Sequence, residues 1–325
     1  MKHQDSKPKS QILITGAAGF IGSHVSKMLL EEGREVVCVD NFNDYYDPKL
    51  KDYRAEEIQE KYRTKVLRID IRDVAKLETL FSEHKFTAVI HLAGMAGVRY
   101  SMENPNLYFE VNTIGTLNIL EMMRKYDVPK IVIASTSSLY AGGEMPFSEK
   151  LPVNTPISPY AASKKGAEVI AYTYHHLYDI DVTVVRYFTV FGPAGRPDMS
   201  YFRFIKAVDE GKPIELFGDG MQTRDFTYVS DIASGTIRAM KKVGYEIVNL
   251  GGGKKPISIN YMINLIEKLL QKKALINQKD SNKADMDSTS ADISKASKLL
   301  DWQPLVDFED GIKACVNWYK GNKEF

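Results

Sequence analysis

Short apolar runs alternate with amphipathic stretches along the first 190 residues of the chain. Each run is rich in β-branched residues and short enough to form a buried strand: 11–15, 35–39, 65–69, 88–92, 131–138 and 182–187. The stretches between them place apolar residues three and four positions apart, as amphipathic helices do. Strands that alternate with helices at this spacing predict a doubly wound α/β fold with a parallel sheet and right-handed crossovers. Such sheets bind ligands at the carboxyl ends of their strands.

The pattern loosens after residue 190, where turn-forming residues take over. The rest of the chain predicts helices and short strands at 200–210, 214–217, 231–242, 247–250, 259–270, 294–300 and 308–320. The polar stretch 272–290 predicts no clear element. We therefore expect three parts: a flexible tail over 1–10, a large α/β domain over 11–190, and a smaller mixed α/β region over 191–325. The last part would act as a substrate lid, with some of its chain returning to the first domain.

A glycine-rich loop follows the first strand and leads into the first helix. Gly16, Gly19 and Gly22 let the backbone turn tightly and approach a pyrophosphate at the helix N-terminus. The second strand ends at Asp40, whose carboxylate suits a ribose 2′-hydroxyl and repels a 2′-phosphate. Strand, glycine loop, helix, strand and acid stand in the order of a Rossmann-type site. The sequence therefore predicts that residues 11–190 bind NAD rather than NADP.

The later strands also end in residues that suit a cofactor site. Asp70 and Ile71 follow the third strand, a small-residue turn ending at Gly94 follows the fourth, and Thr136 belongs to the hydroxyl run of the fifth. Asp70 has an alternative interpretation as a helix cap. We expect His91, at the end of the fourth strand, to be structural. No cluster of His, Cys and Asp has metal-ligand spacing, so we expect no metal.

The stretch 158–164 predicts a helix that carries a tyrosine and a lysine on one face. Ser158 and Pro159 are typical of a helix start, and Tyr160 and Lys164 then lie one turn apart. An ammonium group beside a phenol favours the phenolate, which a tyrosine needs to act as a base, because its unperturbed pKa is about 10. A chance pair on a surface helix is the alternative. The cofactor residues at the neighbouring strand ends favour a catalytic pair.

Composition narrows the classes of function. The chain has 325 residues, with 44% hydrophobic and 26% charged residues, which is typical of a soluble globular protein with a sizeable core. A net charge of +1 without a long basic run argues against a nucleic-acid or polybasic membrane partner. No stretch approaches the roughly 18 apolar residues of a membrane span, and residues 1–10 lack the apolar segment of a signal peptide. Two distant cysteines do not suggest a disulfide framework, so we expect a cytoplasmic protein.

Together these motifs resemble the extended short-chain dehydrogenase/reductase family, in its nucleotide-sugar epimerase branch. The resemblance spans nearly the whole chain and rests on the glycine loop, Asp40, Thr136, Tyr160-x-x-x-Lys164 and the stretch 218–231. It implies three catalytic residues, Thr136, Tyr160 and Lys164. The implied cofactor contacts are Gly16, Gly19, Phe20, Ile21, Gly22, Asp40, Asn41, Asp70, Ile71, Leu92, Ala93, Gly94, Asn112, Tyr160, Lys164 and Tyr187. The implied substrate contacts are Arg99, Thr136, Ser137, Ser138, Tyr160, Thr189, Arg196 and Arg224.

Within this branch, the segments 40–47 and 186–199 most resemble 4-epimerases that act on UDP-glucuronate. Epimerases of neutral and N-acetyl sugars, and UDP-glucuronate decarboxylases, typically carry asparagine where this chain has Thr189. The glucuronate epimerases pair a threonine there with an arginine, here Arg196. A hydroxyl and a guanidinium are suitable partners for a sugar carboxylate. The alternatives are that Arg196 only fixes its loop to an acidic neighbour and that Arg224 is a solvated surface residue.

The resemblance implies NAD-dependent C4 epimerisation of a UDP-sugar, with UDP-glucuronate favoured, through a 4-keto intermediate. Open alternatives are a 4-epimerase of UDP-glucose or UDP-N-acetylglucosamine, a UDP-glucuronate decarboxylase, and a catalytically dead protein that senses dinucleotide. A dehydratase is disfavoured because Ser137 and Ser138 stand where such enzymes usually carry an acid pair. Asp287 and Ser288 replace a proline and a basic residue that relatives often place near the nucleotide. The family also implies a homodimer formed through the helices near 113–125 and 160–178.

Overall fold

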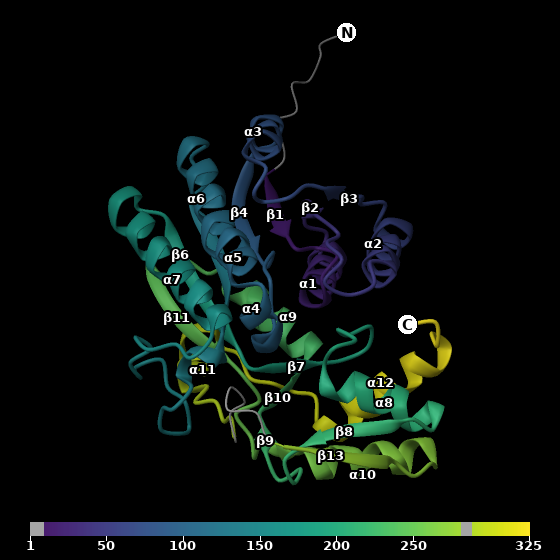
Figure 1. The fold of residues 1–325 in the computed structure, drawn as a ribbon. Coiled ribbons are helices and arrows are strands. Elements are labelled where there is room, and N and C mark those ends of the chain that lie inside the picture. Colours follow the sequence, from purple (N-terminus) through teal and green to yellow (C-terminus); the bar gives the residue numbers. More distant parts are fainter. Residues whose placement is uncertain (1–9, 281–287) are drawn as a thin grey trace.

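The computed structural model of the chain describes residues 10–280 and 288–325. This described part is built on a seven-stranded parallel sheet in the order β11-β6-β5-β4-β1-β2-β3 (Figure 1). Its strands are β1 (Gln11–Thr15), β2 (Val36–Asp40), β3 (Val66–Arg68), β4 (Phe86–His91), β5 (Lys130–Thr136), β6 (Asp181–Tyr187) and β11 (Tyr245–Leu250). The strand order reverses between β1 and β4, which opens a crevice at their carboxyl ends. The doubly wound sheet expected from the sequence is confirmed.

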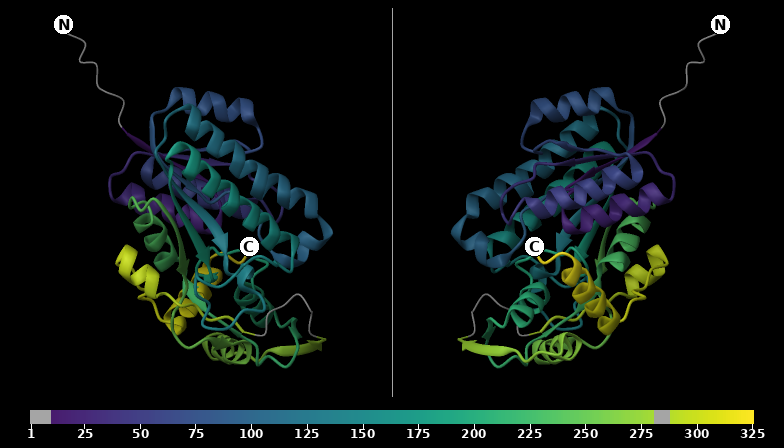
Figure 2. Two further views of the ribbon diagram at one scale, coloured as in Figure 1. Left: turned by 90° about the vertical axis from the view of Figure 1, so that its left-hand side faces the viewer. Right: turned by 90° about the vertical axis from the view of Figure 1, so that its right-hand side faces the viewer.

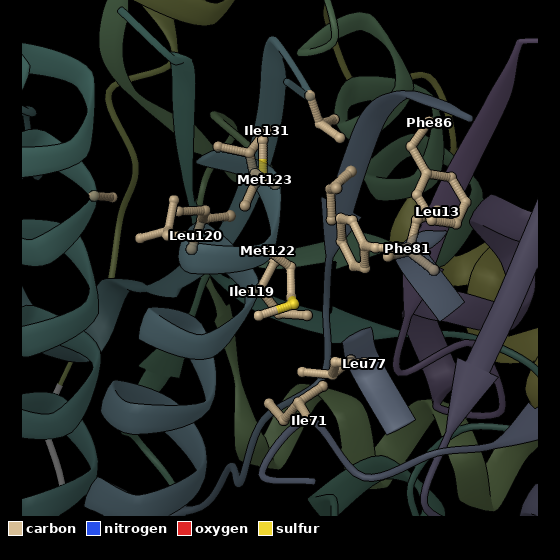
Figure 3. Packing of buried hydrophobic residues seen from close by; sticks show 14 of the residues in the cluster. Leu13, Ile71, Leu77, Phe81, Phe86, Ile119, Leu120, Met122, Met123 and Ile131 are labelled. Carbon is tan, nitrogen blue, oxygen red and sulfur yellow. The ribbon is translucent and has the colours of Figure 1, made fainter. Parts of the chain in front are cut away.

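Helices cover both faces of this sheet (Figures 1 and 2). One face carries α1 (Phe20–Glu31), α2 (Lys49–Tyr62) and α9 (Val229–Arg238), and the other carries α3 (Val74–Glu83), α6 (Gly115–Lys125) and α7 (Pro159–Tyr178). Alternate side chains of β1 point to opposite faces: Ile14 belongs to a cluster with Val25 and Leu29 of α1, whereas Leu13 belongs to the cluster on the other face, beside Phe81 and Phe86 (Figure 3). Burial on both faces explains why the strands are continuous apolar runs.

The C-terminal third adds a second hydrophobic core, in the lower part of Figure 1. It is formed by α8 (Ser200–Glu210), α10 (Ile259–Leu270) and α12 (Phe308–Gly321) together with the parallel pair β8 (Pro213–Phe217) and β13 (Leu275–Lys279). Two smaller pairs connect it to the sheet: β7 (Thr189–Phe191) with β10 (Phe226–Tyr228), and β9 (Thr223–Arg224) with β12 (Ile257–Ser258). The remaining elements are α4 (Val98–Glu103), α5 (Pro105–Tyr108), a π-helical segment (Phe109–Ile114), a 3-10 helix (Ser137–Tyr140) and α11 (Ser294–Leu300).

Some elements differ from those expected. The segment 272–290 contains β13, whose five side chains are all exposed, so that no apolar period marks it. The helix expected near 113–125 begins earlier, as the π-helical segment 109–114, before α6. β11 returns from the C-terminal region to the large sheet, while the boundary at residue 190 stays a prediction. Nearly all of the expected tail, residues 1–9, lies outside the described residues.

Candidate active site

A cavity of about 420 Å³ opens where the carboxyl ends of β1, β2, β4 and β5 face the C-terminal region. Twenty of the residues predicted for catalysis, cofactor and substrate line it: Gly16, Gly19, Phe20, Ile21, Gly22, Asp40, Asn41, Ile71, Leu92, Ala93, Gly94, Thr136, Ser137, Ser138, Tyr160, Lys164, Tyr187, Thr189, Arg196 and Arg224. Residues from nearly the whole length of the chain therefore meet in one place, as the rule for open parallel sheets predicts.

The glycine loop, residues 16–22, forms the cradle at one end of the cavity. Gly16 has a positive φ of 72°, and a Cβ built on it would lie 2.7 Å from the backbone nitrogen of Ala93. A Cβ on Gly22 would collide with the carbonyl oxygen of Gly16. Only glycine lets β1, the loop and the first turn of α1 come so close. The resulting backbone approaches the cavity at a helix N-terminus, which fits the pyrophosphate of a dinucleotide.

Asp40 closes β2 and lines the cavity beside the glycine loop. Its carboxylate accepts hydrogen bonds from the backbone N–H of Ala18 (3.1 Å) and of Phe42 (2.8 Å). These bonds fix the side chain where a ribose would lie. Lys51, which the sequence analysis missed, also lines this part of the cavity, and burial lowers its pKa to about 8. Its Nζ donates to the backbone and side-chain oxygens of Asn43, both at 2.7 Å.

Tyr160 and Thr136 form the centre of the site. Tyr160 lies in the first turn of α7, and Ser158 caps this helix by accepting from the N–H of Ala161. Thr136 ends β5 and accepts from the N–H of Ser138 at 3.1 Å. Burial raises the pKa of the Tyr160 phenol, while a hydrogen bond with Thr136 and the positive charge of Arg196 act to lower it. The arrangement is that of a buried phenol with two groups that favour its ionisation.

Lys164 lies one turn further along α7. Burial lowers its pKa to about 8, while the carboxylate of Glu168 raises it. Its Nζ donates to the carbonyl oxygen of Ala134 at 3.0 Å. The sequence predicted that Lys164 would lower the pKa of Tyr160. In the structure, a hydrogen bond with Thr136 and the charge of Arg196 act in that direction, and the lysine Nζ is bonded to β5.

Arg196 follows β7 on a loop that we call the clamp loop, residues 192–198. Its Nε and Nη2 donate to the two carboxylate oxygens of Asp198 at 3.0 and 2.6 Å. Tyr45 packs its ring 5.6 Å from the guanidinium, and its Oη donates to Asp198 at 3.3 Å. Arg196 thus has the acidic neighbour that the alternative interpretation required. It also lines the cavity with Thr189 and Tyr160, whereas Asp198 is not part of the lining.

The far end of the cavity is lined by Arg224 and Thr289. Arg224 lies in β9, and its Nη1 donates to the carbonyl oxygen of Thr223 at 2.9 Å. Ser288 accepts or donates a hydrogen bond with Thr223 at 2.8 Å, while Asp287 lies outside the described residues. This end of the cavity therefore carries Arg224, one of the substrate contacts that the resemblance implies.

Three residues predicted for the site are not part of the cavity lining. Asp70 accepts from Asn41 at 2.9 Å and pairs with Arg72. Asn112 uses its amide on the backbone of Met95 and on Ser163 Oγ. The Arg99 guanidinium lies 4.1 Å from the centre of the Phe217 ring. The sequence analysis also missed other cavity-lining residues, among them Asn43, Tyr45, Tyr46, Lys51, Met95, Met199 and Thr289. The tyrosines and Asn43 belong to the segment 40–47, which the resemblance had marked.

His91 has a structural place, as expected. It is buried at the end of β4 and forms hydrogen bonds with Thr15 (2.8 Å) and Thr116 (3.1 Å), and burial lowers its pKa to about 3. Within residues 10–280 and 288–325, no group of three His, Cys, Asp or Glu side chains is arranged to hold a metal ion. In the same ranges, every helix falls short of the length and apolar character that crossing a membrane requires.

The sheet, the glycine loop and the Thr–Tyr–Lys set define an NAD-dependent enzyme of the short-chain dehydrogenase/reductase type. The chain belongs to the NAD-dependent epimerase/dehydratase family, since the family model matches residues 12–251. This confirms the family resemblance and the NAD prediction.

Individual relatives are more specific. The chain is 57% identical over 312 residues to the UDP-glucuronate 4-epimerase of Thermodesulfobacterium geofontis, covering 96% of this chain and 97% of that protein. A crystal structure of UDP-glucuronic acid 4-epimerase from Bacillus cereus, in complex with UDP-glucuronic acid and NAD, has a TM-score of 0.90 and 38% identity, covering 96% of this chain and 99% of that one. The UDP-glucose 4-epimerase of Thermotoga maritima is also similar, with a TM-score of 0.86, 31% identity and coverage of 96% and 99%.

Proposed function

We propose that the chain interconverts C4 epimers of a UDP-sugar, with UDP-glucuronate and UDP-galacturonate as the favoured pair. The observation that carries this proposal is that Tyr160, Thr189 and Arg196 line one cavity. A guanidinium and a hydroxyl beside a phenol can hold a sugar carboxylate while the phenol acts on the ring. Relatives named UDP-glucuronate 4-epimerase, at 57% and 38% identity, support the same substrate.

Tyr160 acts as the general base on the sugar 4-hydroxyl and, in the reverse half of the reaction, as the acid. Thr136, which is hydrogen-bonded to it, holds the 4-oxygen and assists the proton transfer. Lys164 holds the nicotinamide ribose. NAD, held by the glycine loop and Asp40, would accept the C4 hydride and return it to the opposite face of the 4-keto sugar. Because the hydride returns to C4 and Tyr160 returns the proton to the 4-oxygen, the reaction involves no net oxidation.

Thr189 and Arg196 form the proposed carboxylate clamp. The 4-keto form of glucuronate is a β-keto acid, which loses CO₂ when its C5–carboxylate bond lies parallel to the carbonyl π system. A carboxylate held by a guanidinium fork and a hydroxyl is kept out of that alignment. Asp198 helps to hold Arg196 in place for this role, because its two hydrogen bonds to Arg196 fix the orientation of the guanidinium.

Incubation with UDP-glucuronate, UDP-glucose and UDP-N-acetylglucosamine, followed by product identification, tests the proposal. We expect UDP-galacturonate from the first substrate and much slower turnover of the neutral sugars. Faster turnover of UDP-glucose would favour the second candidate function, a neutral-sugar epimerase. The similarity to the UDP-glucose 4-epimerase of Thermotoga maritima is the reason for considering this function. Pentose with CO₂ would indicate a decarboxylase, and binding of NAD without any turnover would indicate a dinucleotide sensor.

Variants of the clamp test the carboxylate assignment separately. In Thr189→Ala and Arg196→Ala, we expect UDP-pentose and CO₂ to appear or turnover to be lost. Arg203→Ala is a matched control, because Arg203 is 43% exposed on α8 and pairs only loosely with Glu215 at 3.7 Å. Normal epimerisation without CO₂ in both clamp variants would contradict the assignment.

A homodimer formed through α6 and α7 belongs to the same proposal. Large apolar side chains lie exposed on α7 and on the π-helical segment that leads into α6: Phe109 (43%), Ile114 (49%), Val169 (53%), Tyr172 (53%) and Leu177 (58%). An apolar face of this kind suits a second copy of the chain. The cytoplasmic location expected from the sequence stays a prediction.

A further inference from the structure

Arg54 lies in α2 and is fully buried, with an exposed fraction of 0%. It donates five hydrogen bonds, and none of them ends on a carboxylate. Nε and Nη2 donate to the carbonyl oxygen of Ala194 (2.9 and 2.7 Å), and Nη2 also donates to that of Gly195 (3.1 Å). Nη1 donates to the carbonyl oxygen of Ala18 (3.2 Å) and to Tyr46 Oη (2.7 Å). A buried guanidinium is thus balanced by backbone dipoles of two separate loops.

The first of these loops is the glycine loop. The residue that gives its carbonyl to Arg54, Ala18, gives its N–H to the carboxylate of Asp40 at 3.1 Å. This one peptide segment therefore connects Arg54 to the proposed ribose carboxylate. A shift of the glycine loop on cofactor binding would change the geometry at Arg54 directly.

The second is the clamp loop. Ala194 and Gly195 directly precede Arg196, and Ala194 holds a positive φ of 50°, which a non-glycine residue adopts only when its surroundings require it. Two donors of Arg54 converge on the Ala194 carbonyl and keep the backbone in this turn. The direction in which Arg196 leaves the loop depends on that turn.

We propose that Arg54 is a positioning residue that couples the cofactor loop to the clamp loop, so that Arg196 is correctly set for the sugar carboxylate when NAD is bound. The guanidinium spans the gap between the two loops with a planar fork of fixed geometry, which a lysine cannot reproduce. Arg54 itself is not part of the cavity lining, so it acts through Ala194 and Gly195 rather than by touching substrate. The identity of the substrate in this inference rests on the proposed function, whereas the coupling between the two loops does not depend on it.

Hydrogen exchange of the protein with and without NAD tests the coupling without any turnover. In the wild type, we expect NAD to slow amide exchange in both 16–22 and 192–198. In Arg54→Lys, we expect NAD still to slow exchange in 16–22 but no longer in 192–198. Absence of protection in 192–198 of the wild type, or the same protection in the wild type and in Arg54→Lys, would overturn the proposal. If the variant fails to fold, the wild-type experiment alone can still overturn it.

A product assay tests the consequence for chemistry. For Arg54→Lys we expect kcat/KM for UDP-glucuronate to fall by about 10- to 100-fold, as misplacement of a binding group by about 1 Å does, and the ratio of CO₂ to UDP-galacturonate to rise. Unfolded protein makes neither product, so a merely structural effect leaves this ratio unchanged. Lys27→Gln is the matched control, because Lys27 joins α1 to α2 through Glu57 at 3.1 Å and touches neither loop.

The outcomes separate the two proposals. If the wild type does not convert UDP-glucuronate, the proposed function is wrong. The hydrogen-exchange experiment still decides whether Arg54 couples the glycine loop to the clamp loop. A wild-type enzyme that converts UDP-glucuronate, together with an Arg54→Lys variant of normal kcat/KM and product ratio, overturns the role of Arg54 and leaves the proposed function intact.

Discussion

In the proposed mechanism, the side chain of Arg196 serves both substrate recognition and activation of the base Tyr160. Burial alone makes the Tyr160 phenol a weaker acid, and the hydrogen bond with Thr136 and the charge of Arg196 oppose this effect. The same guanidinium lines the cavity and is the proposed partner of the sugar carboxylate. Asp198, which does not line the cavity, accepts two hydrogen bonds from the Arg196 guanidinium and offsets part of its positive charge. Changes at Arg196 and Asp198 should therefore affect the ionisation of Tyr160 in opposite directions.

Arg196→Gln should raise the pKa of Tyr160, and Asp198→Asn should lower it, each by roughly one pH unit. Removal of the positive charge disfavours the phenolate, so the tyrosine deprotonates at higher pH. Removal of the negative charge leaves Arg196 uncompensated, so the phenolate forms at lower pH. The measurement is an ultraviolet titration of tyrosinate in the NAD-bound enzyme without sugar, with Tyr160→Phe subtracted.

The control for this titration is Lys76→Gln, which removes a positive charge whose side chain is 62% exposed on α3. It should leave the Tyr160 titration unchanged, because solvent screens such a charge. Shifts in the same direction for Arg196→Gln and Asp198→Asn, or no shift in either, would show that Arg196 does not act on the phenol.

At this scale, the sequence predicted residues that carry a chemical signature and missed those that support them. Thr136 and Tyr160 were predicted because hydroxyl, spacing and strand end coincide. Asp70, Asn112 and Arg99 were predicted as contacts, yet they lie outside the lining because other side chains, backbone groups or a ring engage them. Arg54 had no signal in the sequence, since the backbone groups it binds on the clamp loop are 140 and 141 residues away.

The helix α7 is the element on which the site depends most. Its N-terminus sets Tyr160, its second turn sets Lys164, and its third turn presents Glu168, which is buried between Ser135 and Arg186. The Arg186 guanidinium grips Glu168 with bonds of 2.9 and 2.7 Å. These bonds of Glu168 tie α7 to β5 and β6 one turn beyond Lys164.

Loss of the helix cap should weaken both the fold and the site. Ser158→Ala removes the hydroxyl that accepts from the N–H of Ala161 at 3.2 Å, and we expect it to lower the free energy of unfolding by about 1 kcal/mol. Because Tyr160 lies in the capped turn, kcat should fall as well. Chemical denaturation and steady-state kinetics measure the two effects. Ser82→Ala, at an exposed position late in α3, is the control, and an unchanged stability of Ser158→Ala would show that the cap is unimportant.

Sequence patterns predicted the long elements well and the short ones poorly. Strands of the large sheet are buried on both faces, so their composition marks them. β7 and β10 have three residues each, and β13 is wholly exposed, so neither length nor periodicity identifies them. They exist because each pairs with a strand far along the chain, which no local window contains.

In the described part of the chain, the cavity lies where the large sheet, with its buried clusters, meets the separate hydrophobic core of the C-terminal third. The large sheet supplies the cofactor cradle, Thr136 and Tyr160, and the segments after β6 supply Thr189, Arg196 and Arg224. Sequence order predicted this division of labour in outline. It did not predict which contacts fix the position of the two parts relative to each other, because Arg54 and Asp198 form hydrogen bonds between loops that are far apart in the sequence.

The exposed apolar side chains on α7 and on the π-helical segment before α6 predict a dimer in solution. Val169→Glu combined with Ile114→Glu places two charges on this face and should convert the dimer to a monomer. Leu305→Glu is the control, because Leu305 is 82% exposed and lies away from these helices, near α12. Size-exclusion chromatography with light scattering measures the mass. A wild type that is monomeric, or a double variant that stays dimeric, would exclude this face as the interface.

The most direct test of the central claim uses UDP-glucuronate that carries deuterium at C4. The proposed reaction moves that hydride off the sugar and returns it to the opposite face of the same carbon, without exchange with solvent. The account predicts UDP-galacturonate that retains the deuterium at C4, with the label followed by nuclear magnetic resonance and mass spectrometry. Loss of the label to solvent, or no UDP-galacturonate at all, would contradict it.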